Sequence, residues 1–287
     1  ASKVHDPAYL AYLPTAWERW LAEGNSGPAL PSSWPAKGLR RDLVPTSATG
    51  LLGHYSIDAS ASFVEGTWAA VKAAHDCALT AAGLVAAGER AAFALCRPPG
   101  HHAGTDFMGG YCFINNAAVA AQSFLDGGAK RVAILDVDYH HGNGTQDLLQ
   151  DDPRVLFISS HEMPLYPGTG DPSDTGEHDN VINIALKAGT RSKEFREIYE
   201  AQVFPRLRAF KPDLILVSAG FDAHRADPLA NICLETADFA WVTGRICDIA
   251  DQVCEGRVVS ALEGGYDLEA LADSAAAHVK TLQERAA

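Results

Sequence analysis

The sequence predicts a single α/β domain built on a mostly parallel, doubly wound sheet. Short apolar runs that suit buried strands alternate along the chain with longer segments of helical periodicity. Five of the predicted strands also end in polar, glycine-flanked segments, and open α/β sheets bind their ligands beyond the carboxyl ends of the strands. These segments are 97–102, 136–142, 159–161, 220–222 and 263–266. Their shared placement predicts an enzyme with its site at that edge of the sheet.

The predicted elements occur in the following order along the chain. Apolar residues at helical spacing indicate a helix within 4–22, and the proline-containing stretch 24–58 is expected to be a long loop or arm. The predicted strands are 91–95, 131–135, 154–159, 180–184, 213–217 and 257–262. The predicted helices between and after them are 67–87, 114–125, 192–210, 236–253 and 268–283.

Composition suits one globular domain over residues 1–287. The chain is 47% hydrophobic and 21% charged, and no apolar run reaches the roughly 18 residues that a membrane span needs. The N-terminus lacks the hydrophobic stretch of a signal peptide, so no membrane contact is expected. The six cysteines are scattered without a Cys-x-x-Cys pair, which indicates a reducing, cytoplasmic setting. The formal net charge of −13 argues against a nucleic-acid partner and suits a cationic substrate, or solubility alone.

Residues 136–142 follow the strand predicted at 131–135 and concentrate side chains that bind metals. Because side chains alternate along a strand, we expect Asp136, Asp138 and His140 to project to one side. Burying three such groups is costly, and a divalent cation would offset the cost by binding carboxylate oxygen and imidazole nitrogen. The alternative is a strand end that carries solvated acids and a histidine. Three such residues on one face favour the metal site.

Asp222 is the best candidate for a third ligand beside Asp138 and His140, since a catalytic metal usually has three protein ligands and open positions. It follows another predicted strand and is flanked by Gly220 and Phe221. A helix cap or turn aspartate is the alternative. The Asp/His/Asp set favours zinc or a similar ion and does not separate Zn²⁺ from Fe²⁺, Co²⁺ or Mn²⁺.

The adjacent His101 and His102 follow Pro98-Pro99-Gly100, a rigid turn that would aim both imidazoles outward from the strand end. Histidine carries protons near neutral pH, so the pair could divide into a base and an electrostatic partner. Extra metal ligands or core histidines are the alternatives. Asp136 and Asn143 are polar residues that could orient these rings.

Tyr266 follows Gly264-Gly265 at the end of the last predicted strand. Its hydroxyl could donate to an oxyanion that develops during a reaction. A packed or surface ring is the usual role of a loop tyrosine, so the catalytic interpretation depends on the neighbouring motifs.

Six motifs resemble those of the zinc-dependent histone deacetylase family. They are Arg-Pro-Pro-Gly-His-His-Ala (97–103), Gly-Gly-Tyr-Cys-Phe-Ile-Asn-Asn-Ala-Ala (109–118), Asp-Val-Asp-Tyr-His-His-Gly-Asn-Gly-Thr-Gln (136–146), Tyr-Pro-Gly-Thr-Gly (166–170), Ser-Ala-Gly-Phe-Asp (218–222) and Leu-Glu-Gly-Gly-Tyr (262–266). The resemblance extends over nearly the whole chain and implies the arginase–deacetylase α/β fold. Segments 53–58 and 93–97 are most similar to the bacterial acetylpolyamine amidohydrolases, whereas 218–229 looks closer to the class II deacetylases.

The resemblance implies a role for each candidate residue. It makes Asp138, His140 and Asp222 the zinc ligands, His102 the general base and later acid, and His101 its electrostatic partner. It makes Tyr266 the group that polarises the scissile carbonyl. The implied substrate-tunnel residues are Gly110, Tyr111, Tyr166, Leu229 and Asp58. The residues implied for a structural potassium site are Asp136, Asp138, His140, Ser159 and Ser160. Asn143 stands where some members of the family have aspartate.

The resemblance also leaves departures and alternatives. Family chains normally begin with a strand and a loop before the equivalent of 4–9, and we expect that strand to be missing here. A two-metal amidinohydrolase and a non-catalytic deacetylase-like protein are the rival functions. We expect acetylpolyamine substrates, because the similarity near the N-terminus and the long proline-rich arm favour a small polyamine. Acetyl-lysine proteins are the alternative, because Leu229 is apolar where an acid could hold a distant ammonium. We also expect a homo-oligomer, a dimer or tetramer, in which the arm at 24–58 narrows the mouth.

Overall fold

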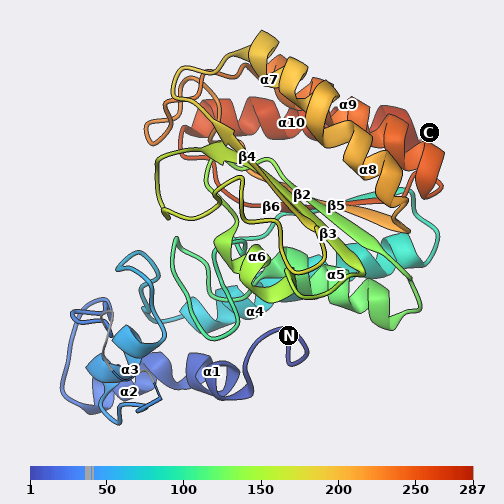
Figure 1. The fold of residues 1–287 in the computed structure, drawn as a ribbon. Coiled ribbons are helices and arrows are strands. Elements are labelled where there is room, and N and C mark those ends of the chain that lie inside the picture. Colours follow the sequence, from blue (N-terminus) through green and yellow to red (C-terminus); the bar gives the residue numbers. More distant parts are fainter. Residues whose placement is uncertain (36–39, 41, 287) are drawn as a thin grey trace.

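Six parallel strands form the centre of the molecule, for which a computed structural model describes residues 1–35, 40 and 42–286 (Figure 1). The strands lie in the order β1-β6-β5-β2-β3-β4, and each neighbouring pair is parallel. Their bounds are β1 Ala91–Ala94, β2 Val132–Asp136, β3 Val155–Glu162, β4 Val181–Leu186, β5 Leu214–Ala219 and β6 Val258–Leu262. The predicted parallel α/β sheet is confirmed, and each predicted strand is found close to its expected bounds.

Helices cover both faces of this sheet (Figure 1). On one face lie α4 Thr67–Ala86, α5 Asn116–Asp126 and α6 Asn143–Leu149; on the other lie α7 Ser192–Ile198, α8 Phe204–Phe210, α9 Thr236–Val253 and α10 Leu268–Ala286. Every residue of β2 and β5 is therefore buried. Continuous aliphatic runs such as these suit strands that are covered on both sides. The two central strands thus form a rigid, apolar platform beneath the loops at their carboxyl ends.

The N-terminal residues form a third cluster beside α4, and here two expectations need correction. The helix expected within 4–22 is divided into α1 Pro7–Tyr12, the 3-10 turn η1 Leu13–Thr15 and α2 Ala16–Ala22. Tyr9 and Tyr12 are buried there against Tyr55. The stretch 24–58 is not all loop, because Ala48–His54 form α3, whose cap Ser47 accepts from Gly50 N. Residues 36–39 and 41 of that stretch lie outside the described part.

Helix α6 is absent from the prediction. Its first residues, Asn143-Gly144-Thr145, have the composition of a turn. Contacts from elsewhere in the chain decide the outcome, because Gly144 N and Thr145 N donate to His101 O at 3.0 and 3.1 Å. The helix predicted over 192–210 is observed, although the π-helical segment η2 Tyr199–Val203 separates α7 from α8.

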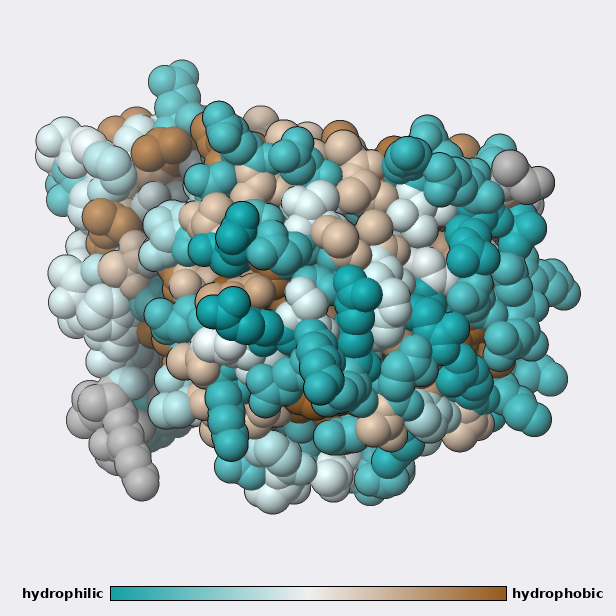
Figure 2. Space-filling view, turned by 90° about the horizontal axis from the view of Figure 1, so that it is seen from above, coloured by the Kyte–Doolittle hydropathy of each residue, from teal (hydrophilic) through white to brown (hydrophobic). Residues whose placement is uncertain are grey.

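The outer surface is mostly polar. Figure 2 shows the face that carries α7–α10, where hydrophilic residues predominate and hydrophobic ones are scattered among them. This is the solvent side of amphipathic helices whose apolar sides face the sheet, as with Phe239 and Ile246 of α9, which are buried. Among the described residues, no helix is both long enough and apolar enough to cross a membrane.

Candidate metal and catalytic site

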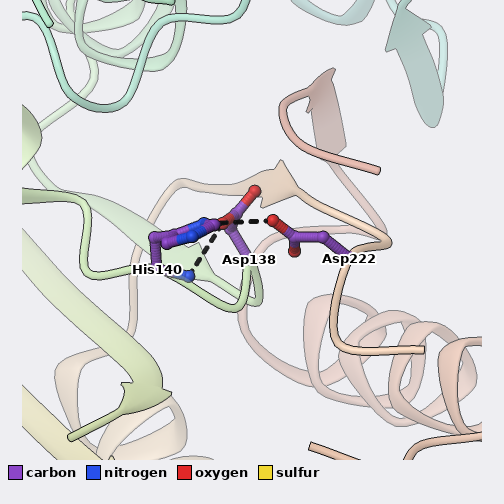
Figure 3. Close-up of side chains that lie close together, drawn as sticks. All are labelled: Asp138, His140 and Asp222. Atoms are coloured by element: carbon purple, nitrogen blue, oxygen red, sulfur yellow. Dashed lines mark hydrogen bonds and ion pairs between the residues drawn. The ribbon is translucent and has the colours of Figure 1, made fainter. Parts of the chain in front are cut away.

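Three potential metal ligands come together at the carboxyl ends of β2 and β5. Asp138, His140 and Asp222 each offer one ligand atom, and these atoms all lie within 4.8 Å of one another. His140 Nδ1 lies 3.2 Å from Asp138 Oδ1 and 3.1 Å from Asp222 Oδ2. Figure 3 shows the three side chains pointing toward one another. The residues predicted as ligands are thus brought together from two strand ends.

Backbone N–H groups hold the two carboxylates in place. Gly264 N donates to Asp138 Oδ2, and Tyr139 N donates to Asp222 Oδ1, both at 2.8 Å. In each carboxylate the other oxygen faces His140. Position 264 requires glycine, because a Cβ there would lie 2.4 Å from Asp222 Oδ2.

The charge balance of the cluster suits a divalent cation. Burial, together with the charge of Asp138, raises the pKa of Asp222 to about 7. Burial alone would lower the pKa of His140, but hydrogen bonds to Asp138 and Asp222 outweigh burial and raise that pKa to about 10. Both shifts arise because two carboxylates are held together away from water. A divalent cation would compensate this negative charge, and carboxylate and imidazole are donors that zinc and similar ions accept.

Asp136 does not belong to this cluster, so the expected single face of Asp136, Asp138 and His140 is wrong. Strand β2 ends at Asp136, and the chain bends over 138–140, which interrupts the alternation of a strand. The Asp136 carboxylate accepts from Asp138 N and lies 2.9 Å from His101 Nδ1. Asp136 therefore contacts the ring of His101, in agreement with the expectation that it could orient the histidine rings.

His101 and His102 pack against each other with ring centroids 4.0 Å apart, and both are buried. Burial would lower the pKa of His101, but the charges of Asp138 and Asp136 outweigh burial and raise that pKa well above its usual value. Burial and the charge of His101 lower the pKa of His102 well below its usual value. His102 Nδ1 lies 2.6 Å from Asn143 Oδ1. These opposite pKa shifts favour the charged form of His101 and the neutral form of His102.

A cavity of about 320 Å³ opens beside His102 and His140. Its lining residues are Asp58, Ala59, Ser60, His102, Gly110, Tyr111, His140, Tyr166, Leu229 and Tyr266. All five residues predicted for the substrate tunnel are among them. A larger cavity of about 600 Å³ adjoins it and shares Ser60, Tyr111 and Tyr266 with it.

The turn at Gly110 and Tyr111 brings the backbone close to His102. Both residues have positive φ, +51° and +65°. A Cβ at position 110 would lie 2.1 Å from His102 Cδ2, so only glycine fits. Tyr111 has a side chain in the left-handed region, which costs on the order of 1 kcal/mol or more. That conformation is held by a hydrogen bond from Tyr111 N to Ser60 Oγ, and it leaves the ring 6.0 Å from that of Tyr266.

The cavity lining also includes the acid Asp58 and the exposed aliphatic side chain of Leu229. Asp58 Oδ2 accepts from Gly110 N at 3.0 Å and from the Tyr166 hydroxyl at 2.6 Å. Burial would raise the pKa of Asp58, but hydrogen bonds from Ser60 and Tyr166 outweigh burial and lower it, so the carboxylate is ionised at neutral pH. Leu229 is 46% exposed. A cationic and an apolar substrate group would both find a partner here.

The two serines predicted for a potassium site have different surroundings. Ser159 pairs with Asp136 across β3 and β2, and its hydroxyl lies 2.9 Å from His161 Nδ1. The Ser160 hydroxyl lies 2.5 Å from that of Tyr199. Asp136 and Ser159 are therefore adjacent, whereas the Ser160 side chain bonds elsewhere.

Asp227 is a site residue that sequence reasoning missed. This buried carboxylate accepts from Tyr266 N at 2.7 Å and from Leu229 N at 3.0 Å. It therefore ties the tyrosine loop to the loop that carries the exposed leucine. An aspartate before Pro228 has the composition of an ordinary turn, so no local signal marks it.

Comparisons with known proteins relate the whole chain to one family. The profile of the histone deacetylase domain matches residues 1–282. Acetylpolyamine amidohydrolase 1 of Pseudomonas aeruginosa is 43% identical over 276 residues, which cover 94% of this chain and 78% of that protein. The chloroplastic histone deacetylase 14 of Arabidopsis thaliana is 44% identical over 194 residues, which cover 66% of this chain and 46% of that protein.

A solved structure agrees with these sequence matches. The acetylpolyamine aminohydrolase of Burkholderia pseudomallei superposes with a TM-score of 0.88 at 33% identity. The superposition covers 97% of this chain and 81% of that structure. The similarity therefore includes the sheet, its helices and the loops at the carboxyl edge.

The ligand cluster predicts tight binding of one divalent ion. Asp222→Ala should weaken metal binding by more than about 100-fold, because it removes one of the three donor groups. Replacing a residue that only hydrogen-bonds to a metal ligand already lowers metal affinity by about 10–100-fold. Titration of metal-free protein with Co²⁺, followed by visible absorption, measures the affinity.

The control for this titration is Asp273→Ala, which removes an exposed acid of α10 and should leave the affinity unchanged. Equal Co²⁺ affinity of the Asp222→Ala variant and the unaltered protein would contradict the assignment of the cluster.

Proposed function

From the membership of the chain in the histone deacetylase family, and from its class as a deacetylase or amidohydrolase, we propose its reaction. The enzyme removes acetyl groups from small amines, and acetylpolyamines are the preferred substrates. The main support is one cavity that is lined by His102, Tyr266 and His140, the last of which belongs to the cluster with Asp138 and Asp222. A two-metal amidinohydrolase is disfavoured, because the described residues contain a single group of three potential ligands.

Zinc is the metal that we propose for the cluster. Its ligands are Asp138, His140 and Asp222, whose carboxylate and imidazole donors suit that ion. Zinc bound there supplies Lewis-acid polarisation of the acyl carbonyl and a water of lowered pKa.

His102 is the proposed general base. Since Asn143 Oδ1 accepts from Nδ1, the hydrogen of the neutral ring is on Nδ1 and the Nε2 lone pair is free. His102 takes a proton from water as the water attacks the acyl carbon, and it later gives that proton to the leaving amine. The charged His101 stabilises the negative charge that develops beside it.

Tyr266 is the proposed donor to the acyl oxygen. Burial and the charges of Asp138 and Asp222 raise the pKa of Tyr266, so its hydroxyl keeps its proton. The hydroxyl donates a hydrogen bond that strengthens as the oxygen becomes negative. Asp227 fixes the backbone of this tyrosine through Tyr266 N.

Three further features belong to the proposal. A potassium ion would be bound by Asp136, Asp138, His140, Ser159 and Ser160. Asp136 and Ser159 are neighbours across the sheet, which supports this site, whereas the Ser160 hydroxyl bonds to Tyr199. The protein forms a dimer or tetramer. It works in the cytoplasm, which agrees with the six free cysteines.

The cavity supports a long cationic amine as substrate. Tyr111 and Tyr166 line it as aromatic walls, and the ionised Asp58 can attract an ammonium group. The names of the bacterial relatives agree with this choice. Leu229 supports the alternative, an acetyl-lysine protein, because its exposed apolar side chain offers no partner to a distant ammonium.

Replacement of Tyr266 by phenylalanine should lower kcat by about 10² or more, the usual loss when an oxyanion donor is removed. Steady-state kinetics on an acetylated amine measures the effect. Tyr111→Phe is the matched control, since it removes a hydroxyl from the same cavity and should change kcat by less than about 3-fold. Turnover of Tyr266→Phe near that of the unaltered enzyme would exclude the tyrosine from the reaction.

Asn143→Asp should move the acidic limb of the kcat/KM profile to higher pH. A carboxylate beside Nδ1 stabilises the imidazolium and raises the pKa of His102, so the base is protonated at a pH where it was neutral. We expect a shift of about 1–2 pH units, as for other close charge pairs.

The control for this profile is Gln146→Glu, which makes the same charge change on α6 beside His141. It should move the limb less. An unchanged limb in Asn143→Asp would mean that another group is the base.

The substrate class is tested by kcat/KM for an acetylated polyamine and for an acetyl-lysine peptide, each at low and at physiological salt. We expect the polyamine to be the better substrate, with the larger advantage at low salt because Asp58 attracts it electrostatically. A higher kcat/KM for the peptide at both salt concentrations would favour the protein deacetylase.

A further inference from the structure

Glu263 is a buried acid between the histidine turn and the tyrosine loop. It follows β6 directly, three residues before Tyr266, and is 6% exposed. Its Oε2 accepts from Gly100 N at 2.7 Å and from His101 N at 3.1 Å, and its Oε1 accepts from Ser218 Oγ at 3.1 Å. One carboxylate therefore joins the turn that follows β1 to the ends of β5 and β6.

The histidine turn depends on this acceptor. Pro98 and Pro99 have no N–H group, so Gly100 and His101 carry the first backbone donors of the turn. Both donors bond to Glu263. Without the carboxylate they would be buried and unpaired, and the turn would move to satisfy them.

The turn is also held from its opposite side. His101 O accepts from Gly144 N and Thr145 N at the start of α6. The backbone of His101 is thus fixed at its N–H by an acid and at its carbonyl by a helix. Because His102 is the next residue, a shift of this backbone moves both imidazoles relative to Asp138 and Tyr266.

We infer that Glu263 is a positioning residue for the histidine pair, acting through its two hydrogen bonds to the backbone of Gly100 and His101. The inference rests on the proposed function of that pair. According to this inference, the length of the Glu263 side chain, rather than its charge, holds the histidine turn in place. Burial raises the pKa of Glu263 to about 7, which agrees with a group whose charge is not essential.

Two conservative variants separate reach from charge. Glu263→Gln keeps the length: its amide oxygen can accept from both N–H groups while its NH₂ donates to Ser218 Oγ. Glu263→Asp keeps the charge but withdraws the carboxylate by about 1.5 Å, the length of one carbon–carbon bond. Ser218→Ala is a further control, because it leaves both backbone hydrogen bonds in place.

The experiment measures kcat and KM of these variants on an acetylated amine, together with the hydrogen-exchange rates of the Gly100 and His101 amides by NMR. Glu263→Asp should lower kcat by about 10²-fold, as a displacement near 1 Å in an active site can, with KM changed less than about 3-fold. Glu263→Gln and Ser218→Ala should keep kcat within about 5-fold. Both amides should exchange faster in Glu263→Asp alone.

Several results would overturn the inference. They are full turnover of Glu263→Asp, a loss in Glu263→Gln as large as in Glu263→Asp, or the same loss in Ser218→Ala. If the unaltered protein hydrolyses no acetylated amine, the proposed function fails and amide exchange alone decides the positioning. Faster exchange confined to Glu263→Asp then supports it, and equal exchange in all variants refutes it.

Discussion

The burial of four acidic side chains at the carboxyl edge of the sheet is the constraint on which the site depends. Asp136, Asp138, Asp222 and Glu263 are all buried there. A carboxylate removed from water is costly unless hydrogen bonds or a cation compensate for it. Each of the four accepts at least one backbone N–H, and the donors come from neighbouring strand ends or from the loops that follow them. The strand ends must therefore close tightly against one another, and glycine is needed where they meet, as at Gly264.

The parallel sheet makes this arrangement possible. Because all six described strands run in one direction, their carboxyl ends share one edge, and Asp136 lies in register with Ser159 on one side and Ser218 on the other. Strands β2 and β5 are buried on both faces, so their ends cannot move apart without disturbing the core. This apolar platform offsets the cost of the buried acids and of the left-handed Tyr111.

Local patterns and distant contacts were not equally predictable from the sequence. The strands and the convergence of Asp138, His140 and Asp222 could be predicted, since apolar runs and the polar segments after them are visible along the chain. Helix α6 could not, because its start is stabilised by His101 O, more than 40 residues earlier in the chain. The prediction that Asp136 shares one face with Asp138 and His140 was wrong, because the backbone bends after β2. Asp227 could not be predicted as a site residue from its neighbours in the sequence, because the Tyr266 N–H group that donates to it is 39 residues away.

The different protonation of the two histidines follows from the residues behind them. Two imidazolium rings with centroids 4.0 Å apart would repel each other, so one proton is favoured over two. The carboxylate of Asp136 lies beside His101, whereas the neutral amide of Asn143 lies beside His102, so the proton is held on His101. His102 consequently remains neutral at pH values where an ordinary histidine is half protonated. The neutral ring is the one that we propose as the base, and two identical side chains become suited to different roles because their partners differ.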